Sequence, residues 1–199
     1  IRGYIGKIFE EDTNLHNHKE DGGFIYQYPR VQYKVIDGLP VLLAIQEGIS
    51  SIMPIFETLL RFQIGDKEYE IFEKTLEIRE AYVGVQKRRI DYQFLSTWLA
   101  LNESNYQKYQ RFGTWAKRKK LLEKILIGNI ISMSKSLGYT VPAPIEANII
   151  KMREAKTSLK GTPMLGFLGA FSVNFEIPDY WGIGKSVSRG FGTIKRVES

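Results

Sequence analysis

The stretch YWGIGKSVSRGFGTIKRV, residues 180–197, is the most informative part of the sequence for the fold. It contains four glycines in the pattern G-Φ-G-x5-G-Φ-G, where Φ is Ile183 or Phe191. Glycine is entropically unfavourable except where the backbone bends sharply or approaches another group closely. Backbone N–H groups of such a loop can bind phosphate oxygens, helped by nearby cations and hydroxyls. The candidate phosphate-binding residues are therefore Gly182, Gly184, Lys185, Ser186, Ser188, Arg189, Gly190 and Gly192.

Three other glycine motifs do not fit this context. A dinucleotide-binding fingerprint follows a strand and opens a helix early in a βαβ unit, and a kinase glycine loop precedes a whole catalytic domain. A P-loop needs glycine five positions before the glycine of its Gly-Lys-Ser ending, but Asp179 stands there. A turn-rich hairpin packed against the core remains the alternative interpretation.

The sequence before this segment predicts strands and one long helix. Apolar residues at helical spacing run from Leu121 to Leu137 and predict a helix over 115–137, with Gly138 as its C-terminal stop. We further expect a strand over 81–95, a short helix over 103–112, a strand or hairpin over 144–160, and one long strand or a strand pair over 164–177.

A basic run opens the predicted long helix, where cations are unfavourable against the helix dipole. The run is a candidate contact for a polyanion, with a solvated helix face as the alternative. Its members are Lys117, Arg118, Lys119 and Lys120.

The first eighty residues predict a second set of elements. We expect a short helix over 1–9, strands over 24–36 and 40–45, a helix over 47–62 and a strand over 68–78. An initial strand would complete the βαββαβ order of a ferredoxin-like unit. We therefore expect that a first strand precedes Ile1 in the intact protein.

Composition and charge narrow the range of possible functions. The sequence has no cysteine, which excludes disulfides, thiolate metal sites and cysteine nucleophiles. Residues 1–80 carry 9 Lys and Arg against 14 Asp and Glu, a net charge of −5, whereas residues 81–199 carry 19 against 8, a net charge of +11. A basic half favours a polyanionic partner such as nucleic acid.

The glycine pattern resembles the glycine-rich loop of the RAMP superfamily of CRISPR-associated proteins. Within that superfamily, the sequence is similar to the endoribonucleases that process CRISPR repeat RNA. Four stretches carry this resemblance: LHNH (15–18), FIYQYPRVQYKVIDG (24–38), LLEKILIGNIISMSKSLGY (121–139) and GFLGAFSVNFEIPDYWGIGKSVSRGFGTIK (166–195).

This resemblance implies an α+β fold of two ferredoxin-like (RRM-like) βαββαβ halves side by side, with the first strand of the N-terminal half absent from this sequence. Residues 1–80 would form the domain that carries the histidine loop. Residues 81–199 would form the domain that carries the glycine-rich loop and a basic surface.

The resemblance also implies metal-independent cleavage of the RNA by its own 2′-OH. The catalytic candidates are His16 and His18 for proton transfer, because imidazole titrates near neutrality, and Lys19 for charge stabilisation. The three adjacent residues His-Asn-His do not match the spacing of a metal-dependent HNH nuclease. The two histidines with Asp12 or Asp21 are only a weak candidate set of metal ligands. We expect no cofactor and no metal.

The expected partner is CRISPR repeat RNA, together with subunits of a CRISPR effector complex as further candidates. The alternative function is that of a non-catalytic RAMP subunit which only binds RNA, and a third is an unrelated enzyme whose glycine loop binds a nucleotide. No apolar run of 18 residues is present, so no membrane helix is expected. We expect a cytoplasmic monomer or homodimer.

Overall fold

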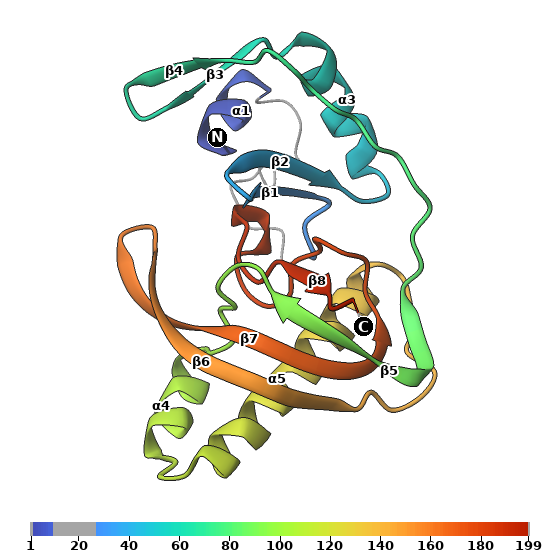
Figure 1. The fold of residues 1–199 in the computed structure, drawn as a ribbon, viewed down its shortest axis with the longest axis vertical. Helices are drawn as coiled ribbons and strands as arrows, with labels where there is room; N and C mark the ends of the chain where they lie inside the picture. The colour runs from blue at the N-terminus through green and yellow to red at the C-terminus, as the bar shows by residue number, and fades with distance from the viewer. Residues whose placement is uncertain (1, 10–26, 199) are drawn as a thin grey trace. The chain divides into compact units, whose positions relative to one another are not determined.

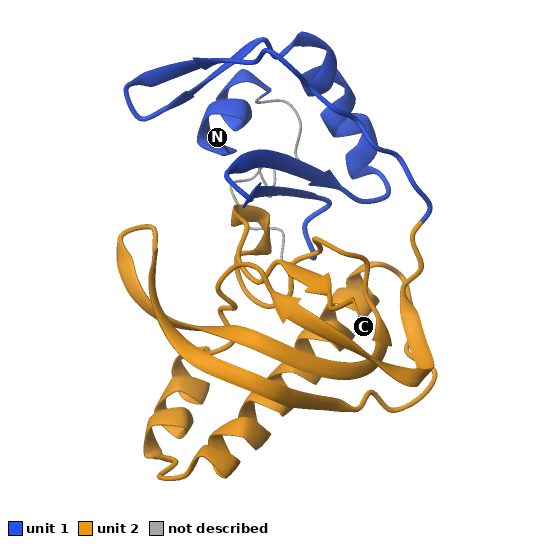
Figure 2. Cartoon of the chain, viewed as in Figure 1, with its two compact units in different colours: residues 1–80 blue, residues 81–199 orange. Residues whose placement is uncertain are grey.

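The computed structural model describes residues 2–9 and 27–198. The chain has an α+β fold and divides into two compact units, residues 1–80 and 81–199 (Figure 2). Within the described residues, no helix has both the length and the apolar character needed to cross a bilayer.

In the N-terminal unit, helices α1 (Arg2–Ile8) and α3 (Gly48–Thr58) pack against a two-stranded sheet (Figure 1). A turn at Asp37 and Gly38, both at positive φ, joins the antiparallel strands of that sheet. The buried side chains at its centre are Ile5, Val31, Tyr33 and Ile55. Its described elements are α1 (Arg2–Ile8), β1 (Val31–Ile36), β2 (Leu39–Ala44), α3 (Gly48–Thr58), β3 (Arg61–Ile64) and β4 (Lys67–Glu70).

The hairpin of β3 and β4 differs from the prediction. Helix α3 ends at Thr58, so residues 61–62 belong to a strand and not to a helix. The tight turn at Gly65, with φ of 59°, pairs Ile64 with Lys67. The strand expected over 68–78 is wrong beyond Glu70. The Ile71 N–H still donates to the Leu60 carbonyl at 2.9 Å, but residues 71–78 belong to no strand in the described part of the chain.

The order α1-β1-β2-α3-β3 is that of a ferredoxin-like unit from its first helix onward. In such a unit the initial strand lies between the strands that correspond to β2 and β3. The described part of this unit contains two separate sheets, β1-β2 and β3-β4.

The C-terminal unit is built on a four-stranded antiparallel sheet with strand order β6-β7-β5-β8. This is the ferredoxin-like order, with β5 and β7 in the centre. Its elements are β5 (Gly84–Phe94), α4 (Glu103–Arg111), α5 (Trp115–Ser136), β6 (Ala147–Leu159), β7 (Thr162–Glu176), η1 (Val187–Arg189) and β8 (Ile194–Arg196). Most of these elements lie within two or three residues of their predicted bounds, and the 164–177 stretch is one long strand.

Helix α5 covers one face of this sheet and buries its apolar stripe there (Figure 1). The predicted stop is confirmed, because Gly138 has a φ of 78° and its N–H donates to the Lys135 carbonyl at 3.2 Å. The Tyr139 N–H donates to the Ser134 carbonyl at 2.9 Å, which completes a Schellman motif. The side chains at the centre of this interface are fully buried: Leu122, Leu126, Ile130, Phe167, Phe171, Val173 and Phe175.

The connection from β7 to β8 departs from the ferredoxin-like pattern. A full helix normally links these two strands, but here η1 is the only helical turn between Ile177 and Thr193. The glycine segment, residues 182–192, contains η1 and forms most of this connection.

Candidate functional site

Two glycines of the segment are required by close backbone contacts. Gly184 has a φ of 95°, and a Cβ there would lie 2.6 Å from Nε1 of the buried Trp98. Gly192 has a φ of 65°, and a Cβ there would overlap the carbonyl oxygen of Ile183. Side chains rarely adopt this left-handed region. The backbone shape of this loop therefore requires glycine at positions 184 and 192.

Several backbone N–H groups of the segment serve the fold itself. Ile183 donates to Gly192 at 2.9 Å, Lys185 to Leu99 at 3.2 Å, and Gly192 to Thr97 at 2.9 Å. The N–H groups of Arg189 and Gly190 close the turn of η1. Phosphate contacts by this loop would therefore rely on its side chains and on its remaining N–H groups.

The segment is fixed to an arch formed by residues 95–97, where β5 leaves the sheet. The Ser96 hydroxyl donates to the Gly190 carbonyl at 2.5 Å and accepts from the Thr193 N–H at 2.9 Å. The Leu95 N–H donates to the Thr193 carbonyl at 2.8 Å. The Ser96 hydroxyl therefore joins the arch to the loop both as a donor and as an acceptor.

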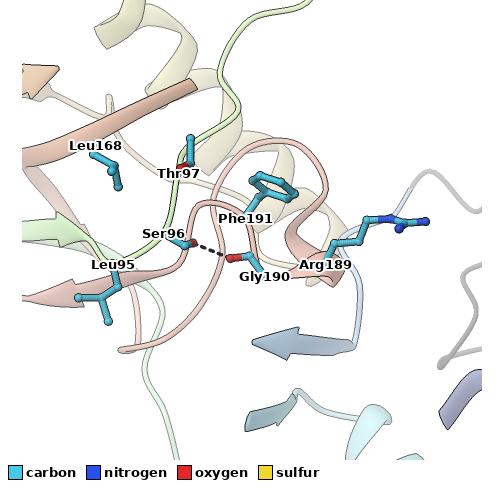
Figure 3. Close-up of a pocket in the computed structure, with 7 residues that line it drawn as sticks. All are labelled: Leu95, Ser96, Thr97, Leu168, Arg189, Gly190 and Phe191. Carbon is cyan, nitrogen blue, oxygen red and sulfur yellow. Dashed lines mark hydrogen bonds between the residues drawn. The ribbon is translucent and has the colours of Figure 1, made fainter. Parts of the chain in front are cut away.

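An open pocket of about 250 Å³ lies between the arch, the glycine segment and β7 (Figure 3). The guanidinium of Arg189 extends away from the other labelled side chains in this view. The lining residues are Leu95, Ser96, Thr97, Leu168, Arg189, Gly190 and Phe191.

The polar side chains of the segment differ in exposure. Lys185 and Arg189 are exposed, and Ser186 and Ser188 are half-buried, with Ser186 at a φ of 57°. The Lys185 Nζ donates to the Leu101 carbonyl at 3.0 Å, and desolvation lowers the pKa of this lysine. Arg189 is thus the cation of the segment most available to a ligand.

The basic run at the start of α5 is split into two roles. Arg118 lies over the Tyr109 ring at 4.8 Å and donates to the Phe112 carbonyl at 3.0 Å. Lys119 donates to Asn148 at 3.0 Å. Lys117 and Lys120 are exposed, and neither forms an ion pair with a carboxylate among the described residues.

The structure separates the two predicted groups of RNA-binding residues. The start of α5 lies beside α4, away from η1 (Figure 1). Within the described ranges, no hydrogen bond or ion pair joins residues 117–120 to the glycine segment.

The catalytic candidates His16, His18 and Lys19 lie outside the described residues, as do Asp12 and Asp21. In residues 2–9 and 27–198, no group of three or more His, Cys, Asp or Glu side chains is placed to hold a metal ion.

Sequence reasoning missed Lys34 on β1. Its side chain is only 3% exposed, and desolvation lowers its pKa to about 7. Strongly shifted pKa values are enriched at functional sites. In the strand VQYKVI, apolar and polar residues alternate, and Lys34 stands at a polar position. Alternation alone suggests that such a position is exposed, whereas the structure buries it.

Two solved structures match nearly the whole chain at more than 30% identity. One solved structure, titled as a crystal structure of Cas6b, is 37% identical, has a TM-score of 0.93, and the match covers 98% of this chain and 89% of that one. A second, titled as the CRISPR RNA processing endoribonuclease Cas6b, is 33% identical with a TM-score of 0.73 over 98% of this chain and 88% of that one.

More distant structures share the fold alone. A CRISPR-associated Cas6 protein is 14% identical with a TM-score of 0.56 over 99% of this chain and 90% of that one. Among curated proteins, an uncharacterized protein of Methanocaldococcus jannaschii is 45% identical over 130 residues, which are 65% of this chain and 88% of that protein.

Family models match both units. The model of the Cas6b N-terminal domain matches residues 1–82, and the model of the Cas6b C-terminal domain matches residues 84–197. Together with the two-part α+β fold, these matches confirm the resemblance to the endoribonucleases that process CRISPR repeat RNA: the chain belongs to the Cas6b family.

Proposed function

We propose that this chain is an endoribonuclease that cuts CRISPR repeat RNA to release mature guide RNAs. The observation that carries the proposal is the match over nearly the full chain to a solved Cas6b titled as a CRISPR RNA processing endoribonuclease, at 33% identity. The excess of cations in residues 81–199 and the exposed Lys117 and Lys120 support an RNA substrate.

The proposed reaction needs no metal ion. One histidine of the pair His16 and His18 removes the 2′-OH proton, and the 2′ oxygen attacks the adjacent phosphorus. The other histidine protonates the departing 5′ oxygen, while Lys19 stabilises the added negative charge. The P–O bond to the 5′ oxygen breaks, so the products are a 2′,3′-cyclic phosphate and a 5′-OH, and no water is consumed.

The test is cleavage of a labelled repeat RNA from the source organism in the presence of EDTA. We expect the parent chain to cut the RNA and leave a cyclic phosphate at the new 3′ end. His16→Ala should reduce the rate by at least about 100-fold, in line with the loss of a general acid or base. Asn17→Ala is the matched control in the same loop, and it should cut at close to the parent rate.

Two outcomes would contradict the proposal. RNA binding without cleavage by any variant would favour the non-catalytic RAMP subunit. Cleavage that EDTA abolishes would overturn the metal-independent mechanism, whatever the effect of His16→Ala.

A further inference from the structure

The arch at residues 95–97 opens a gap in the face of the C-terminal sheet. Strand β5 pairs with β7 as far as Gln93 and Ala170, and pairing resumes at the bridge between Trp98 and Phe167. Residues 94–97 therefore stand opposite residues 168–169, and the extra backbone bulges away from the sheet. This bulge leaves the Leu168 side chain as part of the pocket lining.

Leu168 lies on the face of the sheet that α5 does not cover. Successive residues of a strand point to opposite faces, and Phe167 is fully buried in the core against Tyr109 and Trp98. Leu168 is half-buried, and so is Ala170, two residues further along the same face. The pocket therefore opens onto the face opposite α5.

Cations surround the pocket on this face. Directly paired residues of antiparallel strands share a face, so Arg153 lies beside Leu168 and Lys151 lies beside Ala170. In the same way Lys195 of β8 lies beside Gln93. Arg153 and Lys151 are exposed, and neither forms an ion pair with a carboxylate in the described part of the chain. On this face, the residues paired with Leu168 and Ala170 are thus positively charged. Asp91 lies further along the sheet, beside Ser172.

The pocket has the size and lining suited to one nucleobase. Its volume of about 250 Å³ is below the range typical of sites for drug-sized ligands, so it has room for one small ring system. Leu95, Leu168 and Phe191 supply apolar contact surface. The Phe191 N–H has no acceptor among the described residues and is available to a polar edge of a base.

We propose that this pocket receives one unpaired nucleobase of the RNA, while Arg153 and Lys151 bind the adjoining phosphates. Bases in single-stranded RNA are splayed out and stacked on aromatic or apolar side chains. The hydrogen bonds from Ser96 to the glycine segment hold the pocket in shape before RNA binds. The proposal rests on the proposed function, since the occupant is part of the same RNA.

The experiment measures RNA binding by fluorescence anisotropy with a set of repeat RNAs from the source organism. Each RNA has one nucleotide replaced by an abasic residue, which keeps the phosphate and removes the base. We expect the abasic change at one position to weaken binding by the parent chain about 5- to 150-fold, the range for losing one stacked base. Leu168→Trp, which fills the pocket, should bind the unmodified RNA more weakly and no longer respond to that abasic change.

The phosphate contact is tested with two charge-neutralising variants of β6. Arg153→Gln should weaken binding of every RNA in the set and reduce its salt dependence, because each phosphate contact contributes to the salt slope. Lys156→Gln is the matched control, since Lys156 pairs with Leu165 on the opposite face of the same strand. Equal losses for both variants would overturn the role of this face.

The remaining outcomes separate this proposal from the proposed function. If repeat RNA is cut but no abasic position matters, or if Leu168→Trp responds to the abasic change as the parent does, the base pocket is wrong and the endoribonuclease stands. If the parent chain binds no repeat RNA, both proposals fall. Should Leu168→Trp fail to fold, as judged by circular dichroism, Leu168→Met and Phe191→Leu make the same comparison with smaller changes of volume.

Discussion

The backbone N–H of Ile183 donates to the carbonyl oxygen of Gly192 at 2.9 Å, and a Cβ at position 192 would overlap the carbonyl oxygen of Ile183. The two strands of backbone are therefore so close that only glycine fits at 192. Gly192 also donates to Thr97, which ties this contact to the arch. The shape of the glycine segment and the shape of the pocket thus depend on the same contact.

Gly192→Ala should lower the free energy of unfolding by about 2–4 kcal/mol, because it combines a steric overlap with a left-handed φ. Urea unfolding of the purified chain measures this change. Gly128→Ala is the control, for which we expect a change in the free energy of unfolding of the opposite sign. Gly128 is exposed within α5 and has no atom within 4 Å of an added Cβ, so alanine there should stabilise by about 0.5–1 kcal/mol. Unchanged stability of Gly192→Ala would contradict the close approach.

Asn129→Leu should destabilise the C-terminal unit by about 1–3 kcal/mol, because it leaves a buried N–H without an acceptor. Trp98 is fully buried, and its Nε1–H donates to Asn129 Oδ1 at 3.2 Å. Asn129→Asp keeps an acceptor oxygen and should lose less. Urea unfolding measures both variants, and equal stability of Asn129→Leu and Asn129→Asp would contradict the prediction.

The basic run of α5 should divide into residues for binding and residues for stability. Replacing both exposed lysines, Lys117 and Lys120, by Gln should weaken RNA binding and lower the salt slope by about 1.4 if each contacts one phosphate of single-stranded RNA. The thermal unfolding of this double variant should be the same as that of the parent chain.

Lys119→Gln is the counterpart, because Lys119 is held by Asn148 at 3.0 Å and by Glu123 at 3.7 Å. It should lower stability by about 0.5–1 kcal/mol and affect RNA binding less. The division is wrong if Lys119→Gln weakens RNA binding as much as the exposed pair does.

Lys34 should make the stability of the parent chain rise with pH above neutrality. Burial lowers its pKa to about 7 from 10.5 in the unfolded chain, so the unfolded state binds more protons between these values. Relative to Lys34→Met, the parent should therefore gain up to about 1.4 kcal/mol for each pH unit from pH 7 to 10. Below pH 7 the difference should be constant.

Urea unfolding at pH 6, 7.5 and 9 measures this dependence. Lys67→Met is the control, because Lys67 is exposed on β4 and should give a pH profile parallel to that of the parent. A parallel profile for Lys34→Met as well would show that Lys34 titrates normally.

Local patterns predicted the elements whose cause is local. The apolar stripe of α5 follows from the spacing of Leu122, Leu126 and Ile130, and the end of that helix follows from Gly138. The turn signal at Asp37 and Gly38 likewise predicted the β1–β2 hairpin.

The features that sequence reasoning missed depend on distant partners. The arch at 95–97 exists because β7 sets its register against both Gln93 and Trp98, and no local pattern encodes that register. The burial of Lys34 likewise depends on what covers the second face of β1, whereas alternation along the strand predicts only which residues share a face. The roles of His16, His18 and Lys19 stay predictions from the resemblance.

Strand β5 leaves the ribosome long before the strand that completes its second edge. Tyr92 pairs with Arg196 and Phe94 with Ile194, so the sheet closes only after the segment around residue 196 has emerged. Until then, one edge of a central strand has unpaired backbone groups, which invite pairing with other chains. Pairings this far apart in sequence also form slowly. A chain truncated near residue 180 should therefore be prone to aggregate, even though it contains α5 and the β6–β7 hairpin.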